Sequence, residues 1–466
     1  MKADISHIAS NTPTYIAAAL PTAEQLSEQR YRNSIALHTQ LLCSGVFVSN
    51  RKPEAVIAED LYFKDYHFHD WATTKWKINP KAKAVTLWAP ATKEFKATPK
   101  VTSVYTPGFG CTLLPDGAQR TAFAPPQILP VKNAPKQRHF PVKQSNPEIE
   151  AALDLAFDDS KWDTPNNTRA MVIVHKGQII GERYAKGFAA DQRLIGWSMG
   201  KSVAALLFGV FVHETGYNID DPVPIAEWAG RGDPRGAITA RHLLNMAGGL
   251  KFHNPGPKDS SYYSELHDHE SVYFRGQNTE ALSIKQPLQY TPGTVFQYRN
   301  ANTLTLMSLL KRYAHQTDQS HLSWPRTALF DKIGSSSFVL EPDAYGNFVI
   351  TGYDYATALD WAKLGQLLLQ DGVWEGKRLL PKGWGAFMAK PSPASSRYGG
   401  QVWLNSELDL PNVPKDAFWF LGWLGQYVLI IPSRDLVVVR LGHSSEGGTR
   451  AYMNQVVSKA IHALKD

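Results

Sequence analysis

Apolar residues recur along this chain in two patterns: short continuous runs bounded by turn residues, and longer stretches with helical spacing. Two pairs of short runs are separated only by tight turns, Lys176-Gly177 in one pair and residues 432–435 in the other. Such pairs are typical of antiparallel hairpins. The four strands predicted in this way are 171–175, 178–184, 424–431 and 436–441.

The chain beside and between these hairpins has a largely helical pattern, because apolar residues recur there every three or four positions. The predicted helices are 148–157, 198–214, 239–246, 304–314, 356–370 and 449–464. Strands at both ends of the region, bracketing helices, predict an α+β fold in which the two ends pair in one antiparallel sheet. Helices would flank that sheet, and an all-helical lobe would be inserted. We expect an active site in the cleft between sheet and lobe.

The N-terminal third has a separate pattern. Helical spacing covers 25–42, and strand-like runs at 73–79 and 85–89 are joined by a turn, which predicts a small α+β module. Six prolines between Pro125 and Pro147 then indicate an extended connector. The predicted organisation is an N-terminal α+β module at 1–121, a proline-rich connector at 122–145, and the sheet-and-lobe domain at 146–466.

Composition places the chain among globular proteins, with 466 residues, 43% hydrophobic and 20% charged. The formal net charge of +7 is local, because residues 1–140 hold 17 Lys and Arg against 10 Asp and Glu, whereas the remainder holds 32 of each kind. The N-terminal lysines are scattered among apolar residues and form no dense block, so we expect a solvated face and no nucleic-acid partner. The longest wholly apolar run, 203–212, is too short for a membrane span.

Two features bear on localisation. The chain starts Met1-Lys2-Ala3-Asp4 without a visible leader, which leaves either a cytoplasmic protein or a mature chain whose leader has been removed. The only cysteines are Cys43 and Cys111, and we predict that they form a disulfide within the N-terminal module. Two buried thiols are the alternative. The pair favours a periplasmic or secreted protein, with the cytoplasm as the alternative.

A nucleophile is indicated at the start of the apolar helix. Ser198 and Lys201 are three residues apart, so on a helix both side chains lie on one face, one turn apart. A serine beside its own base is suited to nucleophilic catalysis. The same spacing at Ser49 and Lys52 is followed at once by Pro53, which disfavours helical geometry at Lys52.

A second motif comprises Tyr298 and Asn300. It follows a Pro292-Gly293 turn, which can direct a following side chain into a cleft. The matching triplet at residues 31–33 lacks such a turn. A functional tyrosine is therefore expected at Tyr298 only.

The order of these motifs resembles a known superfamily. Ser-x-x-Lys is followed by Pro-Gly-Thr-x-Phe-x-Tyr-x-Asn, and then by a strand with Gly422 ahead of Pro-x-Arg-Asp-Leu-Val-Val-Val. This is similar to the serine β-lactamase and penicillin-binding-protein superfamily, in its class C-like esterase and amidase branch. The resemblance covers roughly residues 146–466. The cysteine-bearing segments 43–50 and 108–114 further resemble the leading module of proteins similar to 6-aminohexanoate-dimer hydrolases.

The resemblance implies a role for each motif residue. Ser198 would be the nucleophile and Lys201 its general base, while Tyr298 would pass the proton to the leaving group. Asn300 would orient Lys201 and the substrate amide. The oxyanion would be bound by the backbone N–H groups of Ser198 and Trp423.

The third motif departs from the pattern of penicillin-recognising members. They carry Lys-Thr-Gly or His-Thr-Gly where this chain has Phe420-Leu421-Gly422. Gly422 would still let substrate approach the strand closely, but the anchor for a substrate carboxylate is missing. We therefore expect a serine hydrolase acting on small-molecule esters or linear amides, with poor turnover of penicillins. If another group such as His443 or Arg450 does not substitute, Phe420 leaves a substrate carboxylate without a charged partner.

Other hypotheses remain open at this stage. One is a class C-type β-lactamase or D-amino-acid peptidase, and another, from a different class, is a catalytically idle binding or scaffold protein. The segment 253–275 is rich in aromatic residues and is expected to form a lid or pocket wall. Its His267-Asp268-His269 triplet is not expected to bind metal, since alternation would separate Asp268 from the histidines. No cofactor is expected, and the oligomeric state is left open.

Overall fold

The computed structural model describes residues 22–61, 69–119, 121–124, 140–143, 145–254, 267–317, 320–444 and 449–464. Most of the predicted connector, 122–145, lies outside these described residues. The proposed domain boundaries at 121 and 146 therefore stay a prediction.

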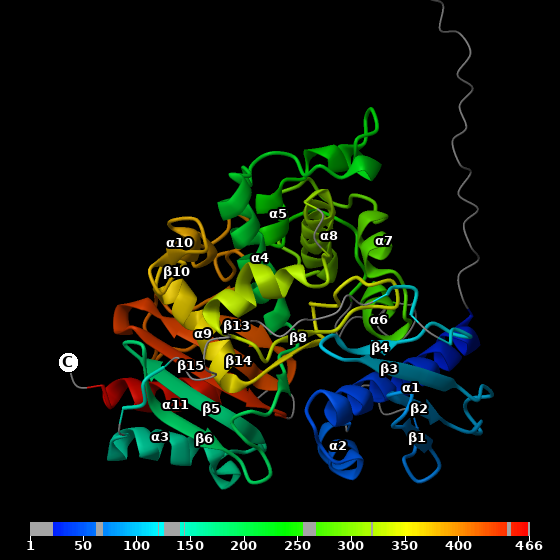
Figure 1. Cartoon of the computed structure of the whole chain (residues 1–466), viewed down its shortest axis with the longest axis horizontal. Coiled ribbons are helices and arrows are strands. Elements are labelled where there is room, and N and C mark those ends of the chain that lie inside the picture. The colour runs from blue at the N-terminus through cyan, green and yellow to red at the C-terminus, as the bar shows by residue number, and fades with distance from the viewer. Residues whose placement is uncertain are drawn as a thin grey trace, which may run out of the picture.

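One antiparallel sheet of six strands organises the C-terminal part of the chain (Figure 1). Its spatial order is β12-β13-β14-β15-β5-β6. The strands are β5 Thr168–His175, β6 Gln178–Tyr184, β12 Trp403–Leu404, β13 Phe418–Gly422, β14 Gln426–Ile431 and β15 Leu436–Gly442. Strand β15 pairs with β5 from Leu436↔His175 onward. The predicted pairing of the first and last segments in one sheet is confirmed.

Helices cover both faces of this sheet because its strands alternate between two apolar sets. Along β15, Val437 and Val439 belong to the core shared with α4 (Met199–Thr215) and α9 (Ala358–Leu369). Leu436 and Val438 belong to a second core under α3 (Pro147–Phe157) and α11 (Thr449–His462). The sheet is therefore buried on both sides, and β14 and β15 are apolar apart from the buried Gln426 and Arg440, which explains their continuous apolar runs.

The insertion between β6 and β12 rises above the sheet (Figure 1). Besides α4 and α9 it contains α5 Ala240–Leu244, α6 Asp268–Phe274, α7 Thr279–Ile284, α8 Asn300–Gln316 and α10 Trp384–Met388. It also contains short strands that were not predicted, because two or three residues leave no periodic signal. These are β7 Leu194–Ile195, β8 Val339–Leu340 and β9 Asp354–Ala356 in one sheet, and β10 Val373–Trp374 with β11 Lys377–Arg378 in another. No helix in the described ranges is long and apolar enough to cross a membrane.

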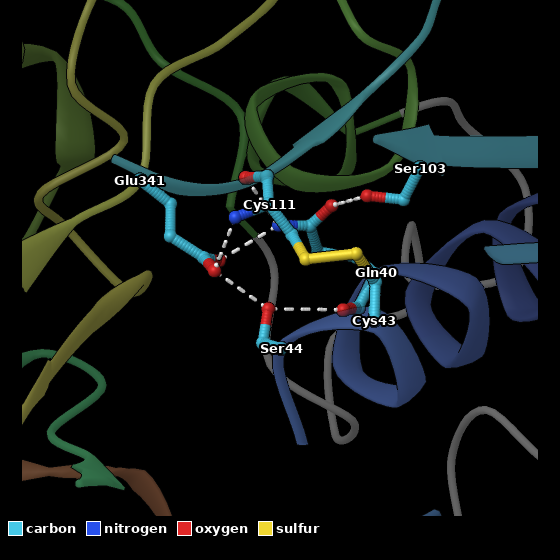
Figure 2. The surroundings of a disulfide bond; sticks show 6 residues. All are labelled: Gln40, Cys43, Ser44, Ser103, Cys111 and Glu341. Carbon is cyan, nitrogen blue, oxygen red and sulfur yellow. Dashed lines mark hydrogen bonds between the residues drawn. A yellow bond between two sulfur atoms is a disulfide. The ribbon is translucent and has the colours of Figure 1, made fainter. Parts of the chain in front are cut away.

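The N-terminal part packs a long helix on a small antiparallel sheet. Its elements are α1 Ala23–Phe47, α2 Pro53–Asp60, β1 Lys75–Asn79, β2 Ala84–Trp88, β3 Lys100–Thr106 and β4 Gly110–Leu113. Cys43 of α1 and Cys111 of β4 form a disulfide, with Cα atoms 6.1 Å apart (Figure 2). The predicted disulfide is confirmed, and the alternative of two free thiols is wrong.

A buried carboxyl group joins this module to the remainder of the chain (Figure 2). Glu341, directly after β8, accepts hydrogen bonds from Gln40 Nε2 at 2.7 Å, Ser44 Oγ at 2.7 Å and the Cys111 backbone N–H at 2.8 Å. Burial raises the pKa of Glu341 to about 8, and these three donors oppose the rise. The loop that begins at Glu341 leads to β9. The hydrogen bonds to Glu341 therefore link the disulfide region to the segment between β8 and β9.

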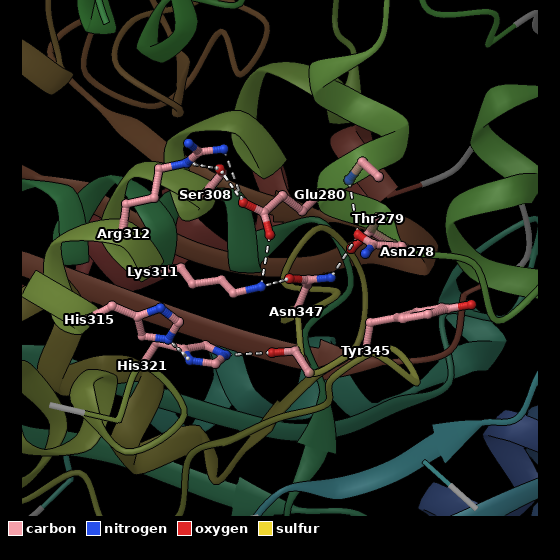
Figure 3. A network of polar contacts seen from close by, with 12 residues as sticks. Asn278, Thr279, Glu280, Ser308, Lys311, Arg312, His315, His321, Tyr345 and Asn347 are labelled. Atoms are coloured by element: carbon pink, nitrogen blue, oxygen red, sulfur yellow. Dashed lines mark hydrogen bonds and ion pairs between the residues drawn. The ribbon is translucent and has the colours of Figure 1, made fainter. Parts of the chain in front are cut away.

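A polar network connects α7, α8 and the 343–347 loop within the insertion (Figure 3). Glu280 of α7 accepts from Lys311 Nζ and Ser308 Oγ of α8, at 2.8 and 2.7 Å. Lys311 also donates to Asn347 Oδ1 at 2.7 Å. These bonds fix α8 against α7 and the 343–347 loop, and α8 begins at Asn300 beside the candidate site.

Candidate active site

Ser198 lies at a sharp turn between β7 and α4. Trp197 adopts φ 53°, the left-handed region that non-glycine residues rarely occupy, and Ser198 follows as the N-cap residue of α4. The turn is closed by backbone bonds from Met199 N to Gly196 O and from Gly200 N to Trp197 O. It leaves the Ser198 side chain partly exposed at the positive end of a helix.

Lys201 lies one turn further along α4, as predicted. Its Nζ donates to Ser198 Oγ at 2.9 Å and to the Thr351 carbonyl at 3.1 Å. Only 1% of the residue is exposed. Burial lowers the pKa of Lys201 to about 7, while the carboxyl group of Asp354 opposes that shift. A lysine with this pKa is largely able to accept a proton near neutral pH.

Tyr298 approaches the same pair from a loop that leads into α8. The loop is anchored by Gly293 N to Ala247 O at 2.7 Å and by Gln297 N to Met246 O at 2.8 Å. Lys201 Nζ lies 4.8 Å from the centre of the Tyr298 ring, which places the phenol next to the Ser198–Lys201 pair. Burial raises the pKa of Tyr298, so the phenol keeps its proton at neutral pH.

Asn300, the first residue of α8, contacts α6. Its Nδ2 lies 3.1 Å from the Tyr273 hydroxyl and 3.3 Å from His269 Nδ1. Tyr273 in turn donates to the Thr351 carbonyl at 2.9 Å, which is the acceptor used by Lys201. Asn300 therefore reaches Lys201 only through Tyr273 and Thr351. Burial lowers the pKa of His269 to about 3, so this histidine is neutral.

Gly422 and Trp423 lie where β13 ends beside β7. A Cβ on Gly422 would lie 2.0 Å from the Gly196 carbonyl, so glycine is needed for the approach of two backbones. The Trp423 ring packs edge-on against Trp197, with centroids 5.1 Å apart. Both candidate oxyanion donors, Ser198 and Trp423, thus belong to segments held together by this contact.

A cleft of about 1360 Å³ opens beside Trp423. Its walls come from β5 and β6, from the end of β15, and from Ala58 and Glu59 of α2, so the N-terminal module contributes one side. Basic side chains at the cleft are partly neutralised, because Arg169 is paired with Asp60. His443 also lines the cleft, and burial lowers its pKa to about 4. Within the described residues no cluster of His, Cys, Asp and Glu is arranged to hold a metal ion.

The β-lactamase family model matches residues 167–461, which is more than half of the chain. The chain belongs to the β-lactamase family. A curated relative is the 6-aminohexanoate-dimer hydrolase of Paenarthrobacter ureafaciens, 25% identical over 223 residues. That match covers 47% of this chain and 56% of the relative, so the chain spans little more than half the length of this relative.

Solved structures have the same fold. A Bacillus anthracis protein assigned as a 6-aminohexanoate-dimer hydrolase has a TM-score of 0.52 at 21% identity, covering 72% of this chain and 89% of that one. A family VIII carboxylesterase has a TM-score of 0.52 at 17% identity, covering 69% and 99%. At these identities the likeness shows the β-lactamase-like fold alone.

Phe420 lies in the middle of β13. It has no exposed surface and packs in the core between β13 and the helices above it. Strand alternation places Phe418, Phe420 and Gly422 on the same inward face. Phe420 therefore supplies no charged partner for a substrate carboxylate, and the expected poor turnover of penicillins stays a prediction.

Three further groups at the site were not identified from sequence. Thr351 contributes a backbone carbonyl, which no side-chain motif can reveal. Tyr273 lies within the aromatic segment interpreted as a pocket wall, but nothing in that segment distinguished it from its neighbours. Asp354 lies two residues before the helix predicted at 356–370, and its only signal is an acidic residue in an otherwise apolar and aromatic strand.

Proposed function

We propose that this protein is a hydrolase that cleaves esters or linear amides through an acyl-serine intermediate. The observation that carries the proposal is the contact of Lys201 Nζ with Ser198 Oγ at 2.9 Å, with the Tyr298 ring centre 4.8 Å from the same nitrogen. A nucleophile within hydrogen-bonding distance of a buried, weakly basic amine is the arrangement that acyl transfer requires.

In the proposed mechanism, Lys201 accepts the proton of Ser198 as Oγ attacks the substrate carbonyl carbon. The resulting oxyanion is bound by the backbone N–H groups of Ser198 and Trp423. Tyr298 donates its proton to the departing alcohol or amine and regains one from Lys201. Water then enters the site, and the same groups act in reverse to release the acid.

The proposed substrate class rests on two supports. The relatives include a 6-aminohexanoate-dimer hydrolase and a family VIII carboxylesterase, which by name act on a linear amide and on esters. Residue 420 supplies no cation, because Phe420 is apolar and buried, which favours esters and amides over β-lactams.

The disulfide also supports an oxidising compartment, and we infer a periplasmic or secreted protein.

The test of function is hydrolysis of short-chain p-nitrophenyl esters and of a linear 6-aminohexanoate dimer by the wild type and by Ser198→Ala. We expect turnover by the wild type and loss of about three orders of magnitude or more in Ser198→Ala. Ser202→Ala is a matched control, because Ser202 also lies on α4 but donates to the Gln401 carbonyl. Equal activity of Ser198→Ala and the wild type, or nitrocefin turnover above that of the esters, would contradict the proposal.

A further inference from the structure

Asp354 on β9 is a buried acid with unusual surroundings. The residue has no exposed surface, and among the described residues neither carboxyl oxygen has a hydrogen-bond partner. Its backbone is fully used, since the carbonyl accepts from Gly196 N at 2.7 Å and the residue pairs with Leu340 in the small sheet. Buried carboxylates are normally paired or hydrogen-bonded, so an acid kept in this condition requires a specific explanation.

The carboxyl group lies directly beneath the first turn of α4. A Cβ added to Gly196 would lie 2.3 Å from Asp354 Oδ2, and one added to Gly200 would lie 2.7 Å from Oδ1. The two glycines around Ser198 therefore leave the space that Asp354 fills. A negative charge at this place is favoured by the N-terminal end of the helix, which carries partial positive charge.

The charged group facing Asp354 from α4 is Lys201, and the two are coupled electrostatically in both directions. The other titratable groups near the pair are Tyr298, Tyr273 and Tyr355, which burial keeps as neutral phenols, neutral His269, and Glu341. Glu341 is satisfied by donors from the N-terminal module. Burial raises the pKa of Asp354 well above its usual range, and the Lys201 ammonium opposes that rise, so a charged Lys201 favours the ionised form of this acid.

We propose that Asp354 is a positioning residue for Lys201: its buried carboxylate is the counter-charge of the ammonium that forms when Lys201 takes the Ser198 proton. In that step the Ser198 O–H bond breaks, an N–H bond forms on Lys201, and Oγ bonds to the substrate carbonyl carbon, whose oxygen takes the electron pair. Positive charge appears on Lys201, of which only 1% is exposed. Asp354 stabilises that charge without contacting the substrate. This inference rests on the proposed acyl-serine function.

The test is the pH dependence of covalent labelling by a fluorophosphonate, measured as second-order rate constants from pH 5 to 9 in the wild type and in Asp354→Asn. Removing an opposite charge makes the Lys201 ammonium less favourable, so its pKa falls. The rising limb of the rate profile should then shift to lower pH by about one to three units. The rate at the plateau should also fall, because a weaker base remains.

Glu341→Gln is the matched control, because it is the same acid-to-amide change at another buried carboxyl group that does not contact Lys201. Glu341→Gln should leave the rising limb of the labelling rate profile at the same pH as in the wild type. Asp354→Ser is a second variant with a smaller neutral side chain, and circular dichroism with thermal melting checks the fold of each. Because the carboxyl oxygens make no hydrogen bond in the described structure, both Asp354 variants should melt at or above the wild-type temperature.

The outcomes separate the two proposals. A wild type that is not labelled at Ser198 would contradict the acyl-serine function itself. A labelled wild type with an Asp354→Asn profile that superimposes on it would overturn the role of Asp354 alone. An equal shift in Glu341→Gln would overturn it as well, because the effect would not be specific. If both Asp354 variants failed to fold, the acid would be a structural requirement and the proposal would be wrong.

Discussion

The disulfide allows the most quantitative prediction about stability. Cys43 and Cys111 are fully buried and are separated by 68 positions, so the bond closes a large loop that contains the last turn of α1, all of α2, and β1 to β3. In the chain-entropy model, opening a loop of this size lowers the free energy of unfolding by about 4 kcal/mol. The change tested is the double substitution Cys43→Ala with Cys111→Ala, since alanine adds no buried hydroxyl group.

The Glu341 contact should survive this change, because it uses the backbone N–H of Cys111 and the side chains of Gln40 and Ser44. The decrease in the free energy of unfolding should therefore come mainly from the greater entropy of the unfolded chain without its cross-link. The lost packing contacts of the two sulfur atoms should add to it.

Hydrogen–deuterium exchange is the suitable assay, because a chain of several units need not unfold in one step. Peptides from residues 22–61 and 69–119 should exchange about a thousandfold faster in the double variant, which corresponds to about 4 kcal/mol. Peptides from β5, β14 and β15 should change little. Wild-type protein treated with reductant should reproduce the variant. A loss below about 1 kcal/mol in the N-terminal peptides would refute the argument from loop closure.

Further predictions concern the site and the core. Activity on esters should rise with pH through about 7, because Lys201 must lose its proton to act as a base and its pKa is about 7; the pH profile of kcat/KM checks this. Lys201→Ala should lower kcat nearly as far as Ser198→Ala, since the two act as a unit. Tyr298→Phe should lower kcat by about two orders of magnitude or more with an unchanged melting temperature, a result that an unchanged kcat would contradict. Phe420→Ala should cost about 3–5 kcal/mol in urea unfolding without changing substrate preference, because Phe420 is core.

Long elements and ordered motifs could be predicted from sequence because each carries a strong local signal. The apolar runs of β14, β15 and α4 could be recognised from their lengths and from the turn residues that bound them. The spacing of Ser198 and Lys201 fixes their relative position on a helix. The Pro292-Gly293 turn distinguished Tyr298 from the tyrosine of the matching triplet at residues 31–33. The cysteine pair could be matched because the chain has only two.

The remainder depends on contacts between segments far apart in sequence. Strands β7, β8 and β9 are too short for a periodic signal, yet their pairing places Asp354 beneath α4. The Thr351 carbonyl cannot be found from side-chain chemistry. Sequence alone does not reveal that the face of β13 carrying Phe420 packs in the core. The face was decided by packing against the helices above the sheet.

The central claim is that Ser198 forms the acyl-enzyme. Its most direct test is mass spectrometry of wild-type protein treated with a fluorophosphonate, followed by peptide mapping of the adduct. We expect one adduct per chain, on Ser198, formed faster at pH 8 than at pH 6, and none in Ser198→Ala. An adduct on another residue, or equal labelling of Ser198→Ala, would contradict it.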